Sequence, residues 1–188
     1  MTLPNISEFI KTFVTKREKS FFEKDLINNN NRLNSEINGK SILVIGGAGT
    51  IGASYIKAAL KYNPAELIVV DTNENGLTEL TRTLRSDSEI IVPDIYLTYP
   101  MSFNSDVFYK MLKKHGSFNI IANFAAHKHV RSEKDSFSIE AMINNNVIDA
   151  KRFLDYLSVN KPSHFFCVST DKAANPVNVM GGSKKLME

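Results

Sequence analysis

The pattern of apolar residues changes at Lys40. From there on, short apolar runs alternate with longer stretches in which apolar residues recur at helical spacing. Runs that are apolar at almost every position predict strands of a parallel sheet that helices cover on both faces. The predicted strands are Ser41–Ile45, Leu67–Val70, Glu89–Val92, Asn119–Ala122 and His164–Val168, and the predicted helices are Ile51–Tyr62, Asn75–Arg85, Asp106–His115 and Ser138–Val159.

Residues before Lys40 follow a different pattern. Apolar side chains such as Ile6, Phe9 and Phe13 recur at helical spacing and predict a helix from about Pro4 to Ile27, followed by a polar linker at Asn28–Asn31. We expect a helical arm that packs on its own domain or on a second subunit. A membrane-surface helix is the alternative, but its phenylalanines are scattered. The predicted domains are therefore 1–38, a helical extension with its linker, and 39–188, a truncated α/β domain.

Composition narrows the functional class. The chain has 188 residues, of which 43% are hydrophobic and 23% charged, which is the balance of one soluble globular domain. A net charge of +3 without a basic stripe disfavours nucleic-acid binding. Cys167 is the sole cysteine and lies in an apolar run, so we expect a buried core residue and a reducing compartment. No segment resembles a signal peptide or a membrane span, which predicts a cytoplasmic protein.

A glycine-rich turn joins the first predicted strand to the first predicted helix. Its sequence is Gly46-Gly-Ala-Gly-Thr-Ile-Gly52. Glycines here permit a tight turn, a close approach of the backbone to a pyrophosphate, and close packing of the helix on the strand, while the helix N-terminus attracts the phosphates. The context predicts a Rossmann-like, doubly wound fold in which Gly46, Gly49, Thr50, Ile51 and Gly52 bind a dinucleotide.

The acidic residue after the second predicted strand indicates which dinucleotide the chain binds. Asp71 can accept hydrogen bonds from an adenosine ribose and would repel a 2′-phosphate, which favours NAD over NADP. Asp94 and Ile95 follow the third predicted strand, where they could contact the adenine edge and ring. A capping aspartate in a turn is the alternative there.

Small residues follow the fourth predicted strand. Ala125 and Ala126 would let the backbone lie against the cofactor, and the cluster His127-Lys-His129 comes next, at the sheet edge where ligands of such folds bind. We see no carboxylates at metal-ligand spacing, so we predict no metal site. Lys128 is a candidate contact for a substrate phosphate or sugar.

These features, taken together with two further segments, resemble the extended short-chain dehydrogenase/reductase family. The likeness covers Lys40 to Glu188 and is strongest to bacterial nucleotide-sugar 4,6-dehydratases of polysaccharide and capsule synthesis, the CapD-like proteins that act on UDP-N-acetylglucosamine. The segments that carry it are Ala125-Ala-His-Lys-His-Val130 and Ser169-Thr-Asp-Lys-Ala173 with Asn175-Pro176 and Val179-Met180.

The resemblance implies a lyase that uses NAD. Hydride leaves C4 of a UDP-sugar, water is lost across C5 and C6, and hydride returns at C6. Such a reaction needs an acid and a base near C5 and C6. We expect Asp171 as the acid and Lys172 as the base, with Ser169 and Thr170 on the C4 oxygen and Asn175 on the substrate. A solvated turn is the alternative for the Asp171–Lys172 pair.

Most members of the family carry a Tyr-x-x-x-Lys pair, and here the spacing is Met180-x-x-x-Lys184. Lys184 fits the role of holding the nicotinamide ribose, but Met180 has no proton to exchange. The larger 4,6-dehydratases are similar in having methionine there, so the substitution indicates that subgroup. The base at C4 stays open between Lys184, Lys172 and a water held by Thr170. Met180 as ordinary core filler is the alternative.

The family places most of its substrate site after the Lys184 helix, and this chain ends at Glu188. We expect a fragment of a larger enzyme that binds NAD weakly and turns over little sugar. A complete but non-catalytic NAD-binding module, or a chain completed by a separate subunit, are the alternatives. A nucleotide-sugar 4-epimerase is the second candidate activity, and a homo-oligomer is expected.

Overall fold

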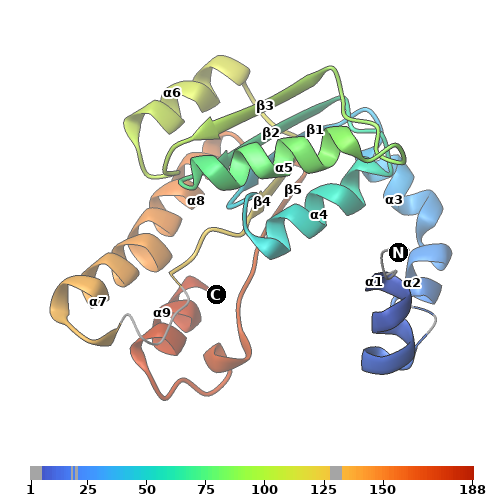
Figure 1. Ribbon diagram of the computed structural model, residues 1–188. Coiled ribbons are helices and arrows are strands. Elements are labelled where there is room, and N and C mark those ends of the chain that lie inside the picture. Colours follow the sequence, from blue (N-terminus) through green and yellow to red (C-terminus); the bar gives the residue numbers. More distant parts are fainter. Residues whose placement is uncertain (1–5, 18, 20, 128–132) are drawn as a thin grey trace. The chain divides into compact units, whose positions relative to one another are not determined.

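The structure is a computed structural model of the chain and describes residues 6–17, 19, 21–127 and 133–188 (Figure 1). It divides into two compact units, Met1–Glu36 and Ile37–Glu188, which are described separately. Among the described residues, no helix is long and apolar enough to cross a bilayer.

The first unit is a series of short helices rather than one long one. They are α1 (Ile6–Phe9), a π-helix (Ile10–Thr15), α2 (Glu23–Asn28) and α3 (Asn30–Ile37), whose last residue belongs to the second unit. The predicted continuous helix is wrong because Lys16 takes left-handed backbone angles that end the π-helix. The predicted linker is also wrong. The Asn29 side chain donates to the Asp25 carbonyl and caps α2, and a new helix begins at once.

The second unit contains the predicted parallel sheet, with strand order β3-β2-β1-β4-β5. The strands are β1 (Ser41–Ile45), β2 (Glu66–Asp71), β3 (Ile95–Pro100), β4 (Ile120–Asn123) and β5 (His164–Cys167). The three central strands are almost fully buried, while β3 and β5 at the edges are partly exposed. Cys167 is accordingly half-buried, which corrects the expectation of a core cysteine.

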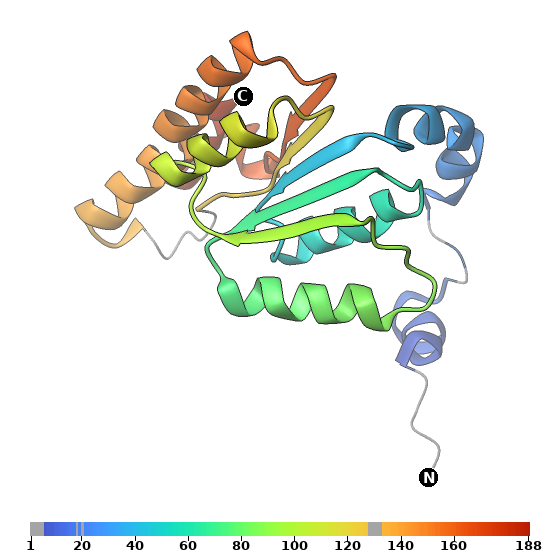
Figure 2. The same ribbon diagram turned by 90° about the horizontal axis from the view of Figure 1, so that it is seen from above.

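Helices cover both faces of the sheet (Figure 2). They are α4 (Thr50–Leu60) and α5 (Glu74–Ser86) on one face, and α6 (Asp106–His115) and α8 (Asp149–Val159) on the other. Each pair packs its apolar side on the strands, exemplified by Leu60 and Leu84 on one face and Phe108 and Phe153 on the other. The fold class predicted from the alternating pattern is therefore confirmed.

The third strand lies six residues later than predicted. Residues 89–92 form no strand, and β3 begins at Ile95. Ile90 and Val92 are apolar because they pack against the α4–α5 side of the core, and not because they pair in the sheet. Periodicity cannot separate these two reasons for a short apolar run.

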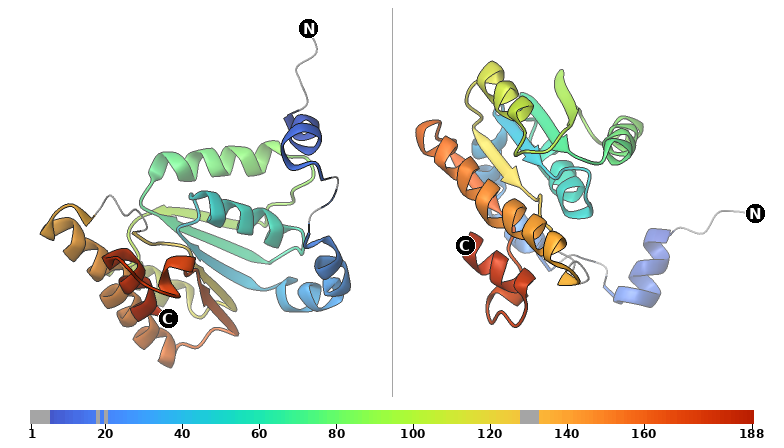
Figure 3. Two further views of the ribbon diagram at one scale, coloured as in Figure 1. Left: turned by 90° about the horizontal axis from the view of Figure 1, so that it is seen from below. Right: turned by 90° about the vertical axis from the view of Figure 1, so that its left-hand side faces the viewer.

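The long predicted helix is interrupted by a π-helical turn. It consists of α7 (Ser136–Ile143), the turn Asn144–Ile148 (η3) and α8. After β5 come a 3-10 turn (Asp171–Ala173, η4) and α9 (Val179–Met187), which lies beside the π-helical turn (Figure 3). This arrangement brings the end of the chain to the carboxyl edge of the sheet.

Candidate functional site

Two adjoining cavities open at the carboxyl edge of the sheet. The larger has a volume of about 500 Å³ and the smaller about 270 Å³. Gly46, Gly49, Phe124 and Ala126 line both. The glycine turn after β1 and the loop after β4 thus form a shared floor, and one extended ligand could occupy both cavities.

Gly46 needs to be glycine for two reasons. Its φ of +76° lies in the left-handed region, and a Cβ atom there would be 2.6 Å from the Ala125 amide nitrogen. Its own N–H donates to the Val70 carbonyl at 2.7 Å. The turn after β1 is therefore pressed against the loop after β4, which is how the predicted tight turn is built.

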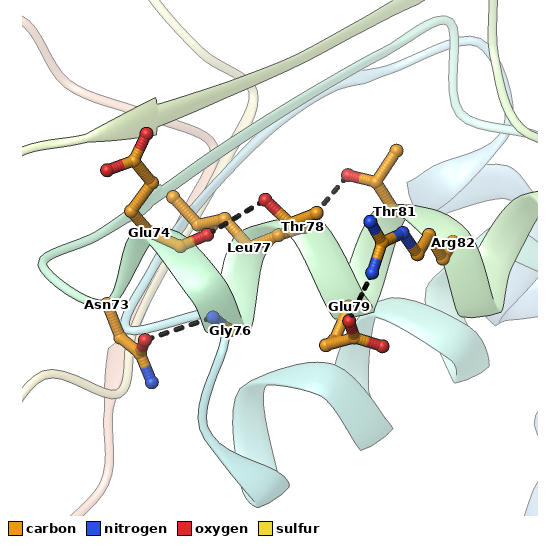
Figure 4. Close-up of polar contacts among 8 residues, drawn as sticks. All are labelled: Asn73, Glu74, Gly76, Leu77, Thr78, Glu79, Thr81 and Arg82. Atoms are coloured by element: carbon orange, nitrogen blue, oxygen red, sulfur yellow. Dashed lines mark hydrogen bonds and ion pairs between the residues drawn. The ribbon is translucent and has the colours of Figure 1, made fainter.

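Asp71 lies at the end of β2 and lines the larger cavity. One carboxylate oxygen accepts the Ala48 N–H at 3.0 Å and the other accepts the Asn73 N–H at 2.9 Å. Asn73 in turn caps α5 by accepting the Gly76 N–H (Figure 4). Each oxygen keeps a second lone pair for a ligand hydroxyl, since an ionised carboxylate has about four acceptor sites.

The exposed side of α5 is tied by local contacts. Thr78 donates to the Glu74 carbonyl at 3.1 Å and Arg82 pairs with Glu79 at 2.6 Å (Figure 4). These solvent-facing contacts contribute little stability individually. The start of α5 is held by the Asn73 cap, and the Asn73 N–H also donates to Asp71, so the helix start and the carboxylate are held together.

Asp94 and Ile95 do not lie at this edge. Ile95 pairs with Glu66 at the start of β2, whereas Pro100 pairs with Asp71 at its end. Ile95 and Pro100 are five residues apart along β3, which corresponds to about 16 Å along the strand. The predicted adenine contact is therefore wrong, because it depended on the misplaced third strand. Met101, Ser102, Phe103 and Asn104 follow β3 instead and line the larger cavity.

The smaller cavity gathers most of the predicted catalytic residues. Its lining includes Ser169, Thr170, Lys172, Met180 and Lys184. The predicted dinucleotide residues Thr50, Ile51 and Gly52 lie on its opposite side, whereas Ala125 lines the larger cavity. Segments more than a hundred residues apart thus face one space, because parallel strands end at the same edge.

Lys184 is the most unusual charged group in the smaller cavity. It is only 4% exposed. Its Nζ donates to the Val168 carbonyl at 3.0 Å and approaches the Met187 sulfur at 3.6 Å, and both partners are neutral. Burial lowers the pKa of the Lys184 ammonium below its usual 10.5. This amine gives up its proton more readily than a surface lysine.

Asp171 is in a different environment. Thr170 donates to its carboxylate at 2.8 Å, and the Lys172 ammonium lies 3.4 Å from the same oxygen. These hydrogen bonds and the lysine charge lower the pKa of Asp171. The carboxylate is therefore ionised at neutral pH and has to gain a proton before it can act as an acid.

Two predicted substrate or catalytic residues of the described chain are not brought into the smaller cavity. Asp171 and Asn175 are exposed and are absent from the described lining of both cavities. Lys128 lies outside the described residues, as does His129. His127 lines the larger cavity. Within the described parts of the chain, no group of three or more His, Cys, Asp or Glu side chains is arranged to hold a metal.

Asn146 is a structural residue that connects three parts of the site. It is 1% exposed, accepts the His127 N–H and donates to the His127 carbonyl, both at 2.9 Å. It also donates to the Ser183 hydroxyl at 3.0 Å. Asn146 thus binds both backbone groups of His127 in the loop after β4. The link to α9 was not predicted.

Glu133 is a second connection that the sequence did not suggest. Its carboxylate accepts the Met180 N–H at 2.8 Å in the first turn of α9. A negative charge there also complements the helix dipole. Nothing in the spacing between residues 133 and 180 signals this contact, which only the folded chain creates.

The 3-10 turn and α9 also approach each other closely. A Cβ atom at Gly181 would be 2.6 Å from the Lys172 carbonyl oxygen. This close approach places Lys172 and Lys184 on the same cavity. The site can therefore offer a ligand the Lys184 amine with its lowered pKa, the half-exposed Lys172 ammonium, and the hydroxyl groups of Ser169 and Thr170.

The family model described as polysaccharide biosynthesis protein matches residues 42–188. A Methanocaldococcus jannaschii protein named as an uncharacterized membrane protein is 34% identical over 79% of this chain and 41% of its own length. A UDP-glucose 4-epimerase of Rickettsia bellii is 30% identical over 79% of this chain and 42% of its own length. A UDP-N-acetylglucosamine 4,6-dehydratase (inverting) of Campylobacter jejuni is 29% identical, with 78% and 41% covered.

Solved structures show the same fold. Pen from Bacillus thuringiensis matches 80% of this chain and 44% of its own, with a TM-score of 0.66 and 22% identity. WbmF from Bordetella bronchiseptica in complex with NAD+ matches 81% and 44%, with a TM-score of 0.58 and 16% identity. The chain thus spans less than half the length of each relative named here.

Proposed function

This chain belongs to the polysaccharide biosynthesis protein family, whose model matches residues 42–188, and on that premise we propose that it is the NAD-binding part of a nucleotide-sugar 4,6-dehydratase. The resemblance to that group, inferred from its motifs, is confirmed. The observation that carries the proposal is the smaller cavity, where Lys172, Lys184 and Thr170 face the glycine turn.

The two cavities fit NAD. The larger one offers Asp71 for a ribose, and the glycine turn contributes no side chain to the shared floor at Gly46 and Gly49. The described lining of the larger cavity contains no lysine or arginine that would pair with a 2′-phosphate. This favours NAD over NADP. The relative WbmF was solved with NAD+, which accords with the proposal.

The smaller cavity suits the chemistry of the sugar. When bound, NAD+ would supply the acceptor for the hydride from C4 and, once reduced, the donor of the hydride to C6. The chain has to remove the C4 hydroxyl proton and the C5 proton, and to protonate the hydroxyl that leaves C6. We propose Lys172 as the base at C5, with Thr170 and Ser169 as hydrogen-bond partners of the C4 oxygen, and the fact that all three line this cavity supports these roles. Asp171 next to Lys172 is proposed as the acid.

Met180 leaves the C4 base to another group. Its side chain is 3% exposed and carries no exchangeable proton. Burial lowers the pKa of Lys184, and the carbonyl to which it donates is neutral. Both observations support the Lys184 amine as the base at C4. Lys172 or a water held by Thr170 would be the other routes.

The proposal is tested by the product. The 188-residue chain and the complete product of its gene are each incubated with UDP-N-acetylglucosamine and NAD+, and the sugar is identified by NMR. We expect the complete product of its gene to form a 4-keto-6-deoxy sugar, and the 188-residue chain to form little of this product. We expect Lys172→Met to abolish it and Lys185→Met, at an exposed neighbouring lysine, to leave it intact. NAD binding without any sugar product from either polypeptide would favour a non-catalytic NAD-binding module.

A 4-epimerase is the second candidate, favoured by the similarity to the Rickettsia enzyme. Its product would keep the C6 hydroxyl and differ from the substrate only at C4. The same NMR spectrum separates the two, because a 6-deoxy sugar shows a methyl signal. The UDP-N-acetylglucosamine substrate, the cytoplasmic location and the homo-oligomer remain predictions, as does the division into 1–38 and 39–188.

A further inference from the structure

Two polar side chains bridge the larger cavity at the end away from the catalytic residues. The Asn104 amide nitrogen donates to an Asp149 carboxylate oxygen at 2.7 Å. Asn104 follows β3 and Asp149 opens α8, so the contact joins two elements that are distant in the sequence. Both residues line the cavity.

This bridge lies where the base of a bound dinucleotide would be. Asp71 at the end of β2 marks the ribose level, and the cavity continues from there to the residues after β3. Met101 and Phe103 give that part an apolar wall on which a purine ring can pack. Asp94, the residue expected at the adenine, lies at the other edge of the sheet.

The bridge presents hydrogen-bond acceptors. One of the two Asn104 N–H groups is directed to Asp149, and the amide oxygen and the unused lone pairs of the Asp149 carboxylate remain as acceptors. Arg152, three residues along α8 from Asp149, pairs with Asp106 at 3.8 Å and lies over the Tyr109 ring. Of the described residues lining the cavity, none is a lysine or arginine that would neutralise Asp149.

We propose that the Asn104–Asp149 bridge selects adenine by accepting a hydrogen bond from its 6-amino group. The inference rests on the proposed NAD binding and assigns the base specificity to this pair. A purine with a 6-oxo group would instead place its oxygen, which can only accept, against the acceptor oxygens of the bridge. One hydrogen bond to a charged group is worth a factor of roughly 10 to 100 in affinity.

The test compares two cofactors by calorimetry on the 188-residue chain. NAD carries adenine, and nicotinamide hypoxanthine dinucleotide differs only in its 6-oxo base. We expect the wild-type chain to bind NAD at least roughly tenfold more tightly. Asp149→Asn should lower or reverse the ratio of the affinity for NAD to that for the hypoxanthine analogue, because the new amide can donate to the 6-oxo group. Asn104→Ala should also shrink it.

Asp155→Asn is the matched control. Asp155 lies on the same helix and pairs only with exposed Lys151 in the contacts seen, so the ratio should equal that of the wild type. Equal affinity of the wild-type chain for both cofactors overturns the base assignment, as does an unchanged ratio in both bridge variants. If the wild-type chain binds neither cofactor, the proposed NAD binding itself fails, which is a distinct outcome.

Discussion

At the scale of single residues, Lys184 shows how burial prepares a group for chemistry. Burial in the folded chain lowers the pKa of its ammonium, which donates to the neutral Val168 carbonyl. The unfolded chain holds the same proton up to about pH 10.5. Between these two pKa values the unfolded state binds more protons, so stability rises with pH in that interval.

We therefore expect Lys184→Met to remove part of the pH dependence of stability. Relative to this variant, the wild-type chain should gain free energy of unfolding as the pH rises from neutral through the lowered pKa towards 10.5. Urea unfolding at a series of pH values measures the difference. Lys185→Met, at a lysine whose side chain is 57% exposed, is the control and should follow the wild type. Parallel curves for Lys184→Met and wild type would contradict the burial effect.

At the same scale, the sequence predicted the cavity residues unevenly. Gly46, Asp71 and Lys184 were recognised because a turn, an acid after a strand and a fixed spacing each have a local signature. Asn104 and Glu133 were not, because their partners Asp149 and Met180 lie 45 and 47 residues away. Contacts of that kind depend on the packing of whole elements, which a local pattern does not encode.

At the scale of elements, α9 is fitted to the 3-10 turn through Gly181. We expect Gly181→Ala to lower the free energy of unfolding by about 1–2 kcal/mol, since overpacking against the Lys172 carbonyl outweighs the gain in helix propensity. Gly182→Ala is the control. A Cβ there meets nothing within 4 Å, so helix propensity should raise stability by up to about 1 kcal/mol.

Chemical denaturation of the two variants decides the point. If Gly181→Ala lowers the free energy of unfolding and Gly182→Ala raises it, the close approach of α9 to the 3-10 turn is present in solution. If both alanines stabilise the chain, the two elements do not touch as described.

The π-helical turn is the second element with a testable role. We expect Asn146→Ala to cost about 2–3 kcal/mol, because it leaves both backbone groups of His127 without their side-chain partner. Asn144→Ala, at an exposed position of the same turn, should cost less than about 0.5 kcal/mol. Thermal unfolding of both variants measures this. Equal losses would mean that the turn matters and the side chain does not.

Prediction of the elements succeeded where one cause controlled the pattern. β1 and α6 have the predicted bounds, because a continuous apolar run and a clean helical period had no competing explanation. β3 was missed, because Ile90 and Val92 are apolar for packing, while the true strand alternates between exposed and half-buried residues at the sheet edge. The misplaced strand then moved the adenine contact to the wrong edge.

At the scale of the whole molecule, all described residues in both parts of the hydrophobic core lie from Ile37 onward. We therefore expect residues 37–188 to fold and to bind NAD without the first 36 residues. Circular dichroism and calorimetry on that segment, beside the full chain, test this. A segment that is unfolded at room temperature would show that residues 1–36 are required for the core.

The π-helical turn Asn144–Ile148 also limits how this chain can change in length. Such a turn accommodates one residue more than an α-helix would need, and each residue advances a helix by about 100°. Deleting one of the three asparagines would restore a regular helix at no cost in backbone hydrogen bonds. A deletion within a regular helix would turn everything beyond it by that angle, but here the wide turn takes up the extra residue, so Phe153 in α8 would still face inward. A single-residue deletion would thus spare the core side of this helix and change the turn that holds Asn146, which connects it to the site.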